Sequence, residues 1–246
     1  MAHQISFFDG ESPLRIGKPI RLIELFGGIG SQAMAPRNLG VPFEHYRLCE
    51  IDRFAVNSYN AVHGTAWEPS DVTKWRGEDL GIERTEDCCY ILTYSYPCTS
   101  ISKAGKMEGM SRDSGTASSL LWEVERLLSE CAELPQILLM ENVADVLSPK
   151  NIDEFSEWCR FLESKGYTNE YQVLNACDYG VPQNRERIFM ASWLGSYYYD
   201  FPEPIPLERR LKDVLEEHVD EKYYLTGEAA DKLIATLRDN AGGGDF

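Results

Sequence analysis

The sequence predicts an α/β fold in which a mostly parallel, Rossmann-like sheet carries helices on both faces. Three observations predict it. Short apolar runs, typical of buried strands, alternate with stretches whose apolar residues recur every three or four positions, as on one face of a helix. A glycine-rich turn follows the first run. Reactive or charged side chains stand directly after several runs, where open α/β sheets bind their ligands.

Each element is predicted from its own pattern. The apolar runs that predict strands are residues 20–26, 46–51, 89–94, 136–143, 170–176 and 187–193. Helical periods predict helices within residues 27–40 and at 52–64, 120–128, 152–162 and 207–225, the last on the surface. Glycines that end helices are expected just past three of them, at Gly40, Gly64 and Gly166.

The chain is predicted to have three parts. Residues 1–19 are a polar leader, residues 20–195 the catalytic domain, and residues 196–246 a C-terminal extension. The extension begins with an aromatic and proline-rich connector and ends in the glycine-rich tail DNAGGGDF, which is expected to be flexible.

The composition argues against several classes of protein. A chain of 246 residues, 43% of them hydrophobic, suits one large domain, with or without a small appendage. No apolar run approaches the ~20 residues of a membrane helix, and the N-terminus has no secretory pattern. The seven cysteines include no C-x-x-C pair, which indicates reduced thiols in a cytoplasmic protein and neither disulfides nor a metal site.

The charge conflicts with one function that the motifs below support. The formal net charge is −16, whereas proteins that bind nucleic acid usually present a basic surface. Net charge governs non-specific binding and does not set the chemistry of a local site. A nucleic-acid enzyme with this composition therefore needs a basic surface from another source.

The first glycine-rich turn predicts a nucleotide site. Gly28 and Gly30 follow the first strand, and with Ala33 they fit G-x-G-x-x-G/A. Glu50 stands 20 residues after Gly30, at the end of the next strand, where a carboxylate can accept hydrogen bonds from ribose hydroxyls. A tight turn beside a solvated glutamate is the alternative. The pattern does not separate NAD from S-adenosylmethionine.

Asp71 is a candidate contact to an adenine or an amino group beyond these strands. A helix N-cap or a turn is the other interpretation, and spacing alone favours it.

A cysteine follows the third predicted strand. Pro97-Cys98 stands where the strand opens into a polar loop, and Lys103, Lys106 and Arg112 in that loop are cations that favour a thiolate nucleophile. A single cysteine is otherwise most often a small buried hydrophobic residue.

Three further charged residues follow or begin strands. Glu141 stands at the end of the fourth, where a carboxyl group can carry a proton. Arg185 and Arg187 are two apart at the start of the sixth, so both point to one face and can hold an oxyanion or a base carbonyl. A surface ion-pair cluster with Glu186 is the alternative.

Four blocks in this order, ELFGGIGS, YPCTSISKAGK, MENV and QNRERIFM, resemble the DNA (cytosine-5)-methyltransferase family over residues 21–193. The resemblance implies a methyltransferase fold, S-adenosylmethionine as methyl donor with S-adenosylhomocysteine as product, and duplex DNA as substrate, from which the target cytosine is flipped. It also implies a bacterial or phage origin.

The resemblance implies a role for each residue of the site. Cys98 would add to C6 of cytosine, Glu141 would hold N3 and share its proton, Arg187 would bind O2, and Arg185 would support the site. The positions that align with the methyl-donor pocket are Phe26, Gly28, Gly30, Glu50, Ile51, Asp71, Val72, Pro97 and Leu120. Ser102, Lys103 and Lys106 resemble the loop that closes over DNA.

The sequence departs from the family at three points. Thr99 replaces the usual Gln after the nucleophile, and Ser31 replaces the last glycine of the first block. The target-recognition region, and the Gly-Asn-Ser-Val-like helix after it that completes the cofactor pocket, are not found. The leading hypothesis is therefore a large subunit whose smaller, more basic partner chain recognises DNA.

Three alternatives remain open from the sequence. A truncated or degenerate methyltransferase would bind S-adenosylmethionine or a partner without turnover. An NAD-dependent oxidoreductase would explain the glycines and Glu50 but leave the other three blocks without roles. RNA is an alternative substrate for the same chemistry.

Overall fold

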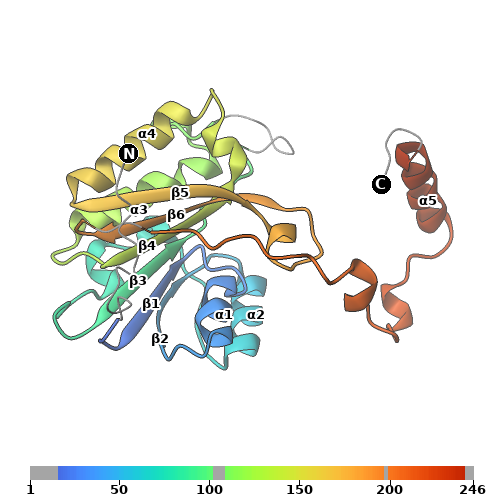
Figure 1. The fold of residues 1–246 in the computed structure, drawn as a ribbon, viewed down its shortest axis with the longest axis horizontal. Coiled ribbons are helices and arrows are strands. Elements are labelled where there is room, and N and C mark those ends of the chain that lie inside the picture. Colours follow the sequence, from blue (N-terminus) through green and yellow to red (C-terminus); the bar gives the residue numbers. More distant parts are fainter. Residues whose placement is uncertain (1–15, 102–108, 197–198, 242–246) are drawn as a thin grey trace.

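The computed structural model describes residues 16–101, 109–196 and 199–241, and they form one six-stranded sheet flanked by helices, followed by an extended C-terminal segment (Figure 1). The strands are β1 (Ile20–Leu25), β2 (Glu44–Cys49), β3 (Cys89–Tyr94), β4 (Ile137–Val143), β5 (Tyr167–Asn175) and β6 (Glu186–Leu194). Their order across the sheet is β2-β1-β3-β4-β6-β5. The first four strands are mutually parallel, and β6 is antiparallel to both β4 and β5.

Helices lie on both faces of the sheet (Figure 1). The helices in the folded body are α1 (Ser31–Asn38), α2 (Arg53–His63), α3 (Leu121–Glu130) and α4 (Ile152–Ser164). Side chains alternate along β1 as strand geometry requires. Ile23 and Leu25 belong to the hydrophobic core with α3 and α4, whereas Glu24 points the other way and contacts Tyr59 of α2. The predicted α/β class with helices on both faces is confirmed.

The core under α3 and α4 fixes the strand ends that carry the site. Trp158 of α4 is fully buried, donates to the Tyr94 hydroxyl at 3.1 Å, and packs edge-on against that ring. Tyr94 is the last residue of β3, so this contact anchors the strand just before Pro97-Cys98. A buried aromatic pair contributes about 0.5–1.5 kcal/mol beyond the burial of its area.

The two C-terminal strands pair as a hairpin-like unit in which β6 enters the sheet between β4 and β5. All nine residues of β5 pair with β6, from Tyr167↔Leu194 to Asn175↔Glu186. On the other side of β6, Glu141 pairs with Phe189 and Val143 with Arg187. This register brings the start of β6 beside the end of β4, and so brings the predicted arginines beside the predicted glutamate.

The helix predicted at residues 207–225 is wrong. The segment contains only two short 3₁₀ turns, Leu211–Val214 and Glu221–Tyr223. Asp213 and Asp220 accept hydrogen bonds from nearby backbone amides, those of Arg210 and Lys222, which favours turns over a helix. The segment also has no surface to pack against, and most helical stability in proteins comes from packing. A helix that was not predicted, α5 (Glu228–Ala241), follows it.

In the described part of the chain, all seven cysteines are free and no helix is long and apolar enough to cross a membrane.

Candidate active site

The turn after β1 has a backbone that only certain residues tolerate. Phe26 adopts a positive φ of 56°, which is rare for a residue with a side chain, and Gly28 and Gly30 have φ of 55° and 83°. At Gly30 a Cβ would lie 2.3 Å from His63 Nε2, so glycine is required there for close packing against α2. At Gly28 a Cβ would meet nothing within 4 Å, so this backbone faces open space. The two glycines therefore differ: Gly30 serves packing, and Gly28 leaves room for a ligand.

Glu50 is oriented by two backbone amides at the end of β2. Its Oε2 accepts from Gly28 N and its Oε1 from Asp52 N, both at 2.9 Å. These bonds tie the glycine turn to the carboxylate. A carboxylate oxygen has a second lone pair, so both oxygens can still accept hydrogen bonds from a hydroxylated ligand.

A cavity of about 200 Å³ collects most of the predicted cofactor residues. Those that line it are Phe26, Glu50, Ile51, Asp71, Val72, Pro97 and Leu120, together with Cys49, Ser70 and Ser95. They come from the ends of β1, β2 and β3 and from segments far apart in the sequence. Its lining combines two carboxylates, those of Glu50 and Asp71, with apolar side chains, as a nucleoside site requires.

Asp71 caps the 3₁₀ turn Val72–Lys74, as spacing alone favours. Its Oδ1 accepts from the Thr73 amide at 2.9 Å and the Thr73 hydroxyl at 2.8 Å, and these hydrogen bonds lower the pKa of the carboxyl below its ordinary value. The side chain also lines the cavity of about 200 Å³. The cap fixes the Asp71 carboxylate in place at the wall of this cavity. In that position the carboxylate can also contact a ligand.

A second cavity, of about 490 Å³, shares Phe26 and Ser95 with the first. Its other walls are the glycine turn with the start of α1, and the facing parts of β4 and β6. The lining residues from these parts are Gly27, Gly28, Ile29, Ser31, Gln32, Ala35, Leu139, Glu141, Arg185 and Phe189. The two cavities therefore adjoin, one lined by the end of β2 and the other by β4 and β6.

Glu141 is contacted by both predicted arginines. Arg187 Nε lies 3.1 Å from Glu141 Oε1, and Arg185 Nη2 lies 3.8 Å from the same oxygen. The Glu141 and Arg187 side chains are about a fifth exposed, and that of Arg185 is about half exposed. The interpretation as a surface cluster with Glu186 finds no support in these contacts, because Glu186 offers Arg187 only its carbonyl, at 2.7 Å.

Cys98 is half-buried at the carboxyl end of β3, on a segment held by two buried polar residues. Asn142 Nδ2 donates to Tyr96 O at 3.0 Å, and Ser118 Oγ donates to Pro97 O at 2.8 Å. Asn142 and Ser118 are at most 2% exposed. Cys98 lines neither of the two cavities, but the residue before it, Pro97, lines the cavity of about 200 Å³.

The expected DNA loop lies largely outside the described residues, since Ser102, Lys103 and Lys106 fall within 102–108. Arg112, which was expected to favour a thiolate, is held elsewhere. Its Nη2 lies 2.6 Å from Glu125 and 2.8 Å from Glu157, and its guanidinium stacks on Trp122. Two carboxylates therefore compensate its charge at the surface of α3 and α4.

Sequence reasoning missed the residues that position the predicted ones. Asn142 and Ser118 hold the cysteine segment, while Gln32 Nε2 donates to Ser95 Oγ at 2.8 Å across the shared wall of the cavities. Asn142 had a signal, because it directly follows Glu141 in the MENV block. Ser118 and Gln32 had none, since their partners are distant in sequence.

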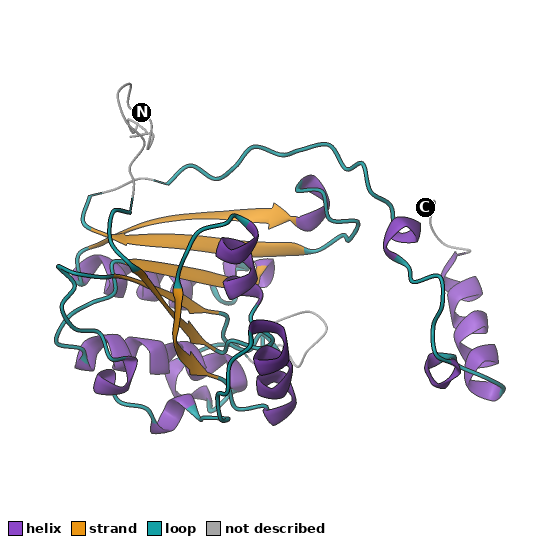
Figure 2. Cartoon of the chain, turned by 90° about the horizontal axis from the view of Figure 1, so that it is seen from below, coloured by secondary structure: helices purple, strands orange, loops and turns teal. Residues whose placement is uncertain are grey.

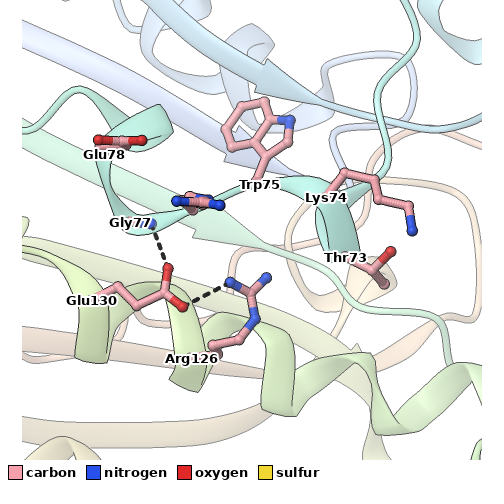
Figure 3. A pocket seen from close by; sticks show the side chains of 8 residues that line it. Thr73, Lys74, Trp75, Gly77, Glu78, Arg126 and Glu130 are labelled. Atoms are coloured by element: carbon pink, nitrogen blue, oxygen red, sulfur yellow. Dashed lines mark hydrogen bonds and ion pairs between the residues drawn. The ribbon is translucent and has the colours of Figure 1, made fainter.

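A larger cavity, of about 720 Å³, is lined by none of the predicted site residues (Figure 3). It is lined by residues 73–78 and by Arg126 and Glu130 of α3. Glu130 accepts from the Gly77 amide and pairs with Arg126, as the dashed lines in Figure 3 mark. It contains neither a strand end nor a predicted nucleophile, so size does not identify the site. In the residues that the structure covers, no cluster of His, Cys, Asp and Glu could hold a metal ion.

Comparison with known proteins places this arrangement in a family. A family model described as C-5 cytosine-specific DNA methylase matches residues 20–243. M2.ScrFI, a type II methyltransferase of Lactococcus lactis subsp. cremoris, is 33% identical, and the match covers 84% of this chain and 70% of that protein. M.SssI, an orphan methyltransferase of Spiroplasma monobiae, is 46% identical over 54% of this chain and 34% of its own length.

Solved structures share the fold. The S. pombe Dnmt2 methyltransferase superposes with a TM-score of 0.67 at 19% identity, covering 89% of this chain and 66% of that one. The chain thus spans only part of the length of these proteins, from about a third to 70%.

Proposed function

The chain belongs to the C-5 cytosine-specific DNA methylase family, and from this premise we propose that it transfers a methyl group from S-adenosylmethionine to C5 of cytosine in duplex DNA. The family, enzyme class and methyl donor expected from the sequence are confirmed. One observation carries the proposal for this chain: Glu141, contacted by Arg185 and Arg187, lies in a cavity that adjoins the glycine turn. A base-binding group and a cofactor pocket then share one wall.

The residues around the first cavity fit S-adenosylmethionine. Glu50, fixed by two amides, can accept from ribose hydroxyls. Gly28 lines the adjoining second cavity, and the open space there admits the part of the ligand that extends past the glycine turn. Apolar side chains of Phe26, Pro97 and Leu120 are suited to cover an adenine ring. When bound, the donor supplies an electrophilic methyl group, and these residues orient it and exclude water.

Cys98 is proposed as the nucleophile. Its thiolate adds to C6 of a flipped cytosine, and the electron pair displaced onto C5 makes C5 nucleophilic. After C5 has taken the methyl group, loss of the C5 proton to a base and elimination of the Cys98 thiolate restore the aromatic ring. Asn142 and Ser118 support this role, because their hydrogen bonds to carbonyls of the cysteine segment limit its movement.

Glu141, Arg185 and Arg187 are proposed to bind the base. Glu141 holds N3 and shares its proton, while Arg187 donates to O2 and stabilises the charge that develops there. Arg185 lines the same cavity with its side chain about half exposed, and supports both residues. In the absence of a base, Glu141 forms ion pairs with Arg187 and Arg185. Binding of cytosine would replace these ion pairs with contacts between the same side chains and the base.

Recognition of DNA is proposed to require a smaller, more basic partner chain. The net charge of −16 supports this, because phosphate contacts supply most of the affinity for duplex DNA. The C-terminal segment offers exposed apolar side chains for such a partner, among them Tyr223, Leu225 and Leu237.

Transfer of labelled methyl from S-adenosylmethionine to mixed-sequence duplex DNA tests the proposal. The chain alone is expected to transfer little, and Cys98→Ser to transfer none. Full activity of the isolated chain would refute the need for a partner while supporting the reaction. RNA, tested in parallel, should be the poorer substrate.

The degenerate alternative is separated from the proposal by 5-fluorocytosine in DNA, which traps the covalent adduct because the fluorine at C5 cannot leave as a proton. A Cys98-dependent adduct supports turnover chemistry. Its absence in the presence of a complementing basic chain would favour a protein that binds S-adenosylmethionine without turnover.

A further inference from the structure

A buried polar cluster lies beneath the glycine turn, on the face of the sheet covered by α1 and α2. Glu24 of β1 is 1% exposed. Its Oε2 accepts a short hydrogen bond from the Tyr59 hydroxyl, which in turn lies 2.8 Å from His45 Nδ1 of β2. Its other oxygen, Oε1, is buried without a hydrogen-bond partner. A carboxyl group in this position is unusual, since buried polar groups normally have their hydrogen bonds satisfied.

The cluster contacts the glycine turn directly. His63 of α2 packs against Gly30, where the space between them is too small for a Cβ. The His63 ring lies 4.5 Å from the Tyr59 ring and 4.9 Å from the His45 ring, centroid to centroid, and its buried nitrogens face the backbone of Ile29 and Gly30 in the turn. Any movement of α2 is therefore transmitted to Gly30 and to the turn.

The charged and titratable groups of the cluster come from four elements. They are Glu24 of β1, His45 of β2, Tyr59 and His63 of α2, and Arg37 of α1, whose Nη1 is bonded to Val62 O. Burial raises the pKa of Glu24 to about 7, and the hydrogen bond from Tyr59 and the nearby Ala33 amide oppose this. Burial lowers the pKa of both histidines. His63 and Arg37 lower the pKa of His45 further, and Arg37 does so at His63, where hydrogen bonds with the backbone of Ile29 and Gly30 oppose the shift. Glu24 is thus the member that changes charge near neutral pH.

We propose that Glu24 is a positioning residue for the cofactor: its protonated carboxyl, acting through Tyr59, His45 and His63, holds the glycine turn in the shape that binds S-adenosylmethionine, and ionisation of this carboxyl weakens binding. The inference rests on the proposed function, because it assigns the ligand of the turn to the methyl donor. It adds a residue that touches neither cofactor nor base.

The hydrogen bonds explain the direction of the effect. With Glu24 protonated, its proton is donated to the Tyr59 hydroxyl, which donates to His45 Nδ1, and the chain of donors is complete. With Glu24 ionised, Tyr59 must donate to Oε2 and His45 must donate from Nδ1, while the Ala33 amide is the other group beside the buried carboxylate that offsets its charge. A buried charge with so few hydrogen bonds is costly. Separation of α2 from the turn relieves it by admitting water.

The test is the affinity of the full chain for S-adenosylhomocysteine, measured by calorimetry between pH 6 and 8.5. In the wild type the affinity is expected to fall about 3- to 10-fold as the pH rises. Glu24→Gln keeps the shape and a hydrogen-bonding group without a titrating proton, so its affinity is expected to be high and independent of pH. In Tyr59→Phe the midpoint moves to higher pH, since the lost hydrogen bond favoured the carboxylate.

Two outcomes overturn the inference, and they are distinguishable. If the wild type and Glu24→Gln show the same dependence of affinity on pH, Glu24 does not position the turn, and the proposed function stands; a lower melting temperature of Glu24→Gln would then show that Glu24 is merely structural. If the folded wild type binds no S-adenosylhomocysteine at any pH, the proposed function fails together with the inference.

Discussion

At the scale of single residues, the ion pairs on Glu141 couple substrate binding to an existing contact. One carboxylate oxygen has Arg187 at 3.1 Å and Arg185 at 3.8 Å. Neither arginine can lose its proton, so they remain donors throughout a reaction. Glu141 alone among the three can both accept and return a proton.

Glu141→Gln is therefore expected to lower methyl transfer about 10²- to 10⁴-fold, as loss of a general acid–base does. Binding of S-adenosylhomocysteine should change less than twofold, because Glu141 does not line the cavity that holds Glu50 and Asp71. Single-turnover methylation with the partner-complemented protein and calorimetry measure the two effects. Equal loss of both would place Glu141 in the cofactor site instead.

Glu24 also makes stability depend on pH. Its pKa is about 7 in the folded protein against the ordinary 4.5, so the folded state binds the proton more tightly. The resulting stabilisation is fully present below pH ~4.5 and is lost as the pH rises to ~7. The free energy of unfolding falls by roughly 3 kcal/mol at most over this range. Denaturant unfolding at pH 5 and pH 8, compared between the wild type and Glu24→Gln, measures it.

Glu24→Gln is expected to lack this dependence of the free energy of unfolding on pH. Glu130, Glu133 and Asp71 have lowered pKa values from hydrogen bonds, so their contributions are lost at pH values below this window. A wild type that gains stability from pH 5 to pH 8 relative to Glu24→Gln would contradict the assignment.

At the scale of elements, the two glycines of the turn after β1 have different roles, Gly28 beside open space and Gly30 in contact with α2. Gly28 and Gly30 both have positive φ, so alanine at either position costs about 1–2 kcal/mol of backbone strain. Only at Gly30 would the new Cβ also collide with α2, at His63 and Tyr59.

Gly30→Ala is thus expected to lower the free energy of unfolding by at least about 1–3 kcal/mol more than Gly28→Ala does. Gly28→Ala should chiefly weaken binding of S-adenosylhomocysteine, because its methyl group enters the space proposed for the ligand. Denaturant unfolding and calorimetry separate the two. Equal loss of stability in both variants would mean that the contact between the turn and α2 relaxes freely.

Elements were predicted well where a local pattern agreed with packing. The apolar run at 89–94 predicts a strand, and that strand is buried along almost its whole length. The helical period from Ile152 predicts a helix, and that helix buries Phe155, Trp158 and Leu162. Residues 207–225 have apolar residues at partly helical spacing, but they contact no core, so turn-forming aspartates decide their structure. Pattern predicts a helix only where a surface exists to receive its apolar face.

At the scale of the whole molecule, the chain divides into a folded body and an extended C-terminal segment (Figure 2). The bridge Tyr179↔Ile205 and the hydrogen bond from the Tyr179 hydroxyl to Pro202 O hold the start of this segment against the body. Beyond it, large apolar side chains are exposed, for example Leu215 at 65% and Tyr223 at 71%. This segment therefore contributes little to the core of the isolated chain.

Deletion of residues 207–246 is accordingly expected to shift the melting temperature by less than about 2 °C, since none of the described side chains from 207 to 237 belongs to the buried core. Thermal unfolding followed by circular dichroism measures this shift. The deletion variant is also expected to associate more weakly with a basic partner chain. A drop of more than 5–8 °C would show that the segment packs on the body.

The sequence by itself determined the strands and helices of the body, the family and the identity of the candidate residues, because period, glycine turns and the four blocks are local properties. Only the tertiary structure decided which residues meet. The pairing of β6 with β4 brings Arg187 to Glu141, and the packing of α2 on the sheet brings Tyr59 and His63 to Glu24. Such contacts depend on register and on helix placement across long stretches of chain, which no local pattern records.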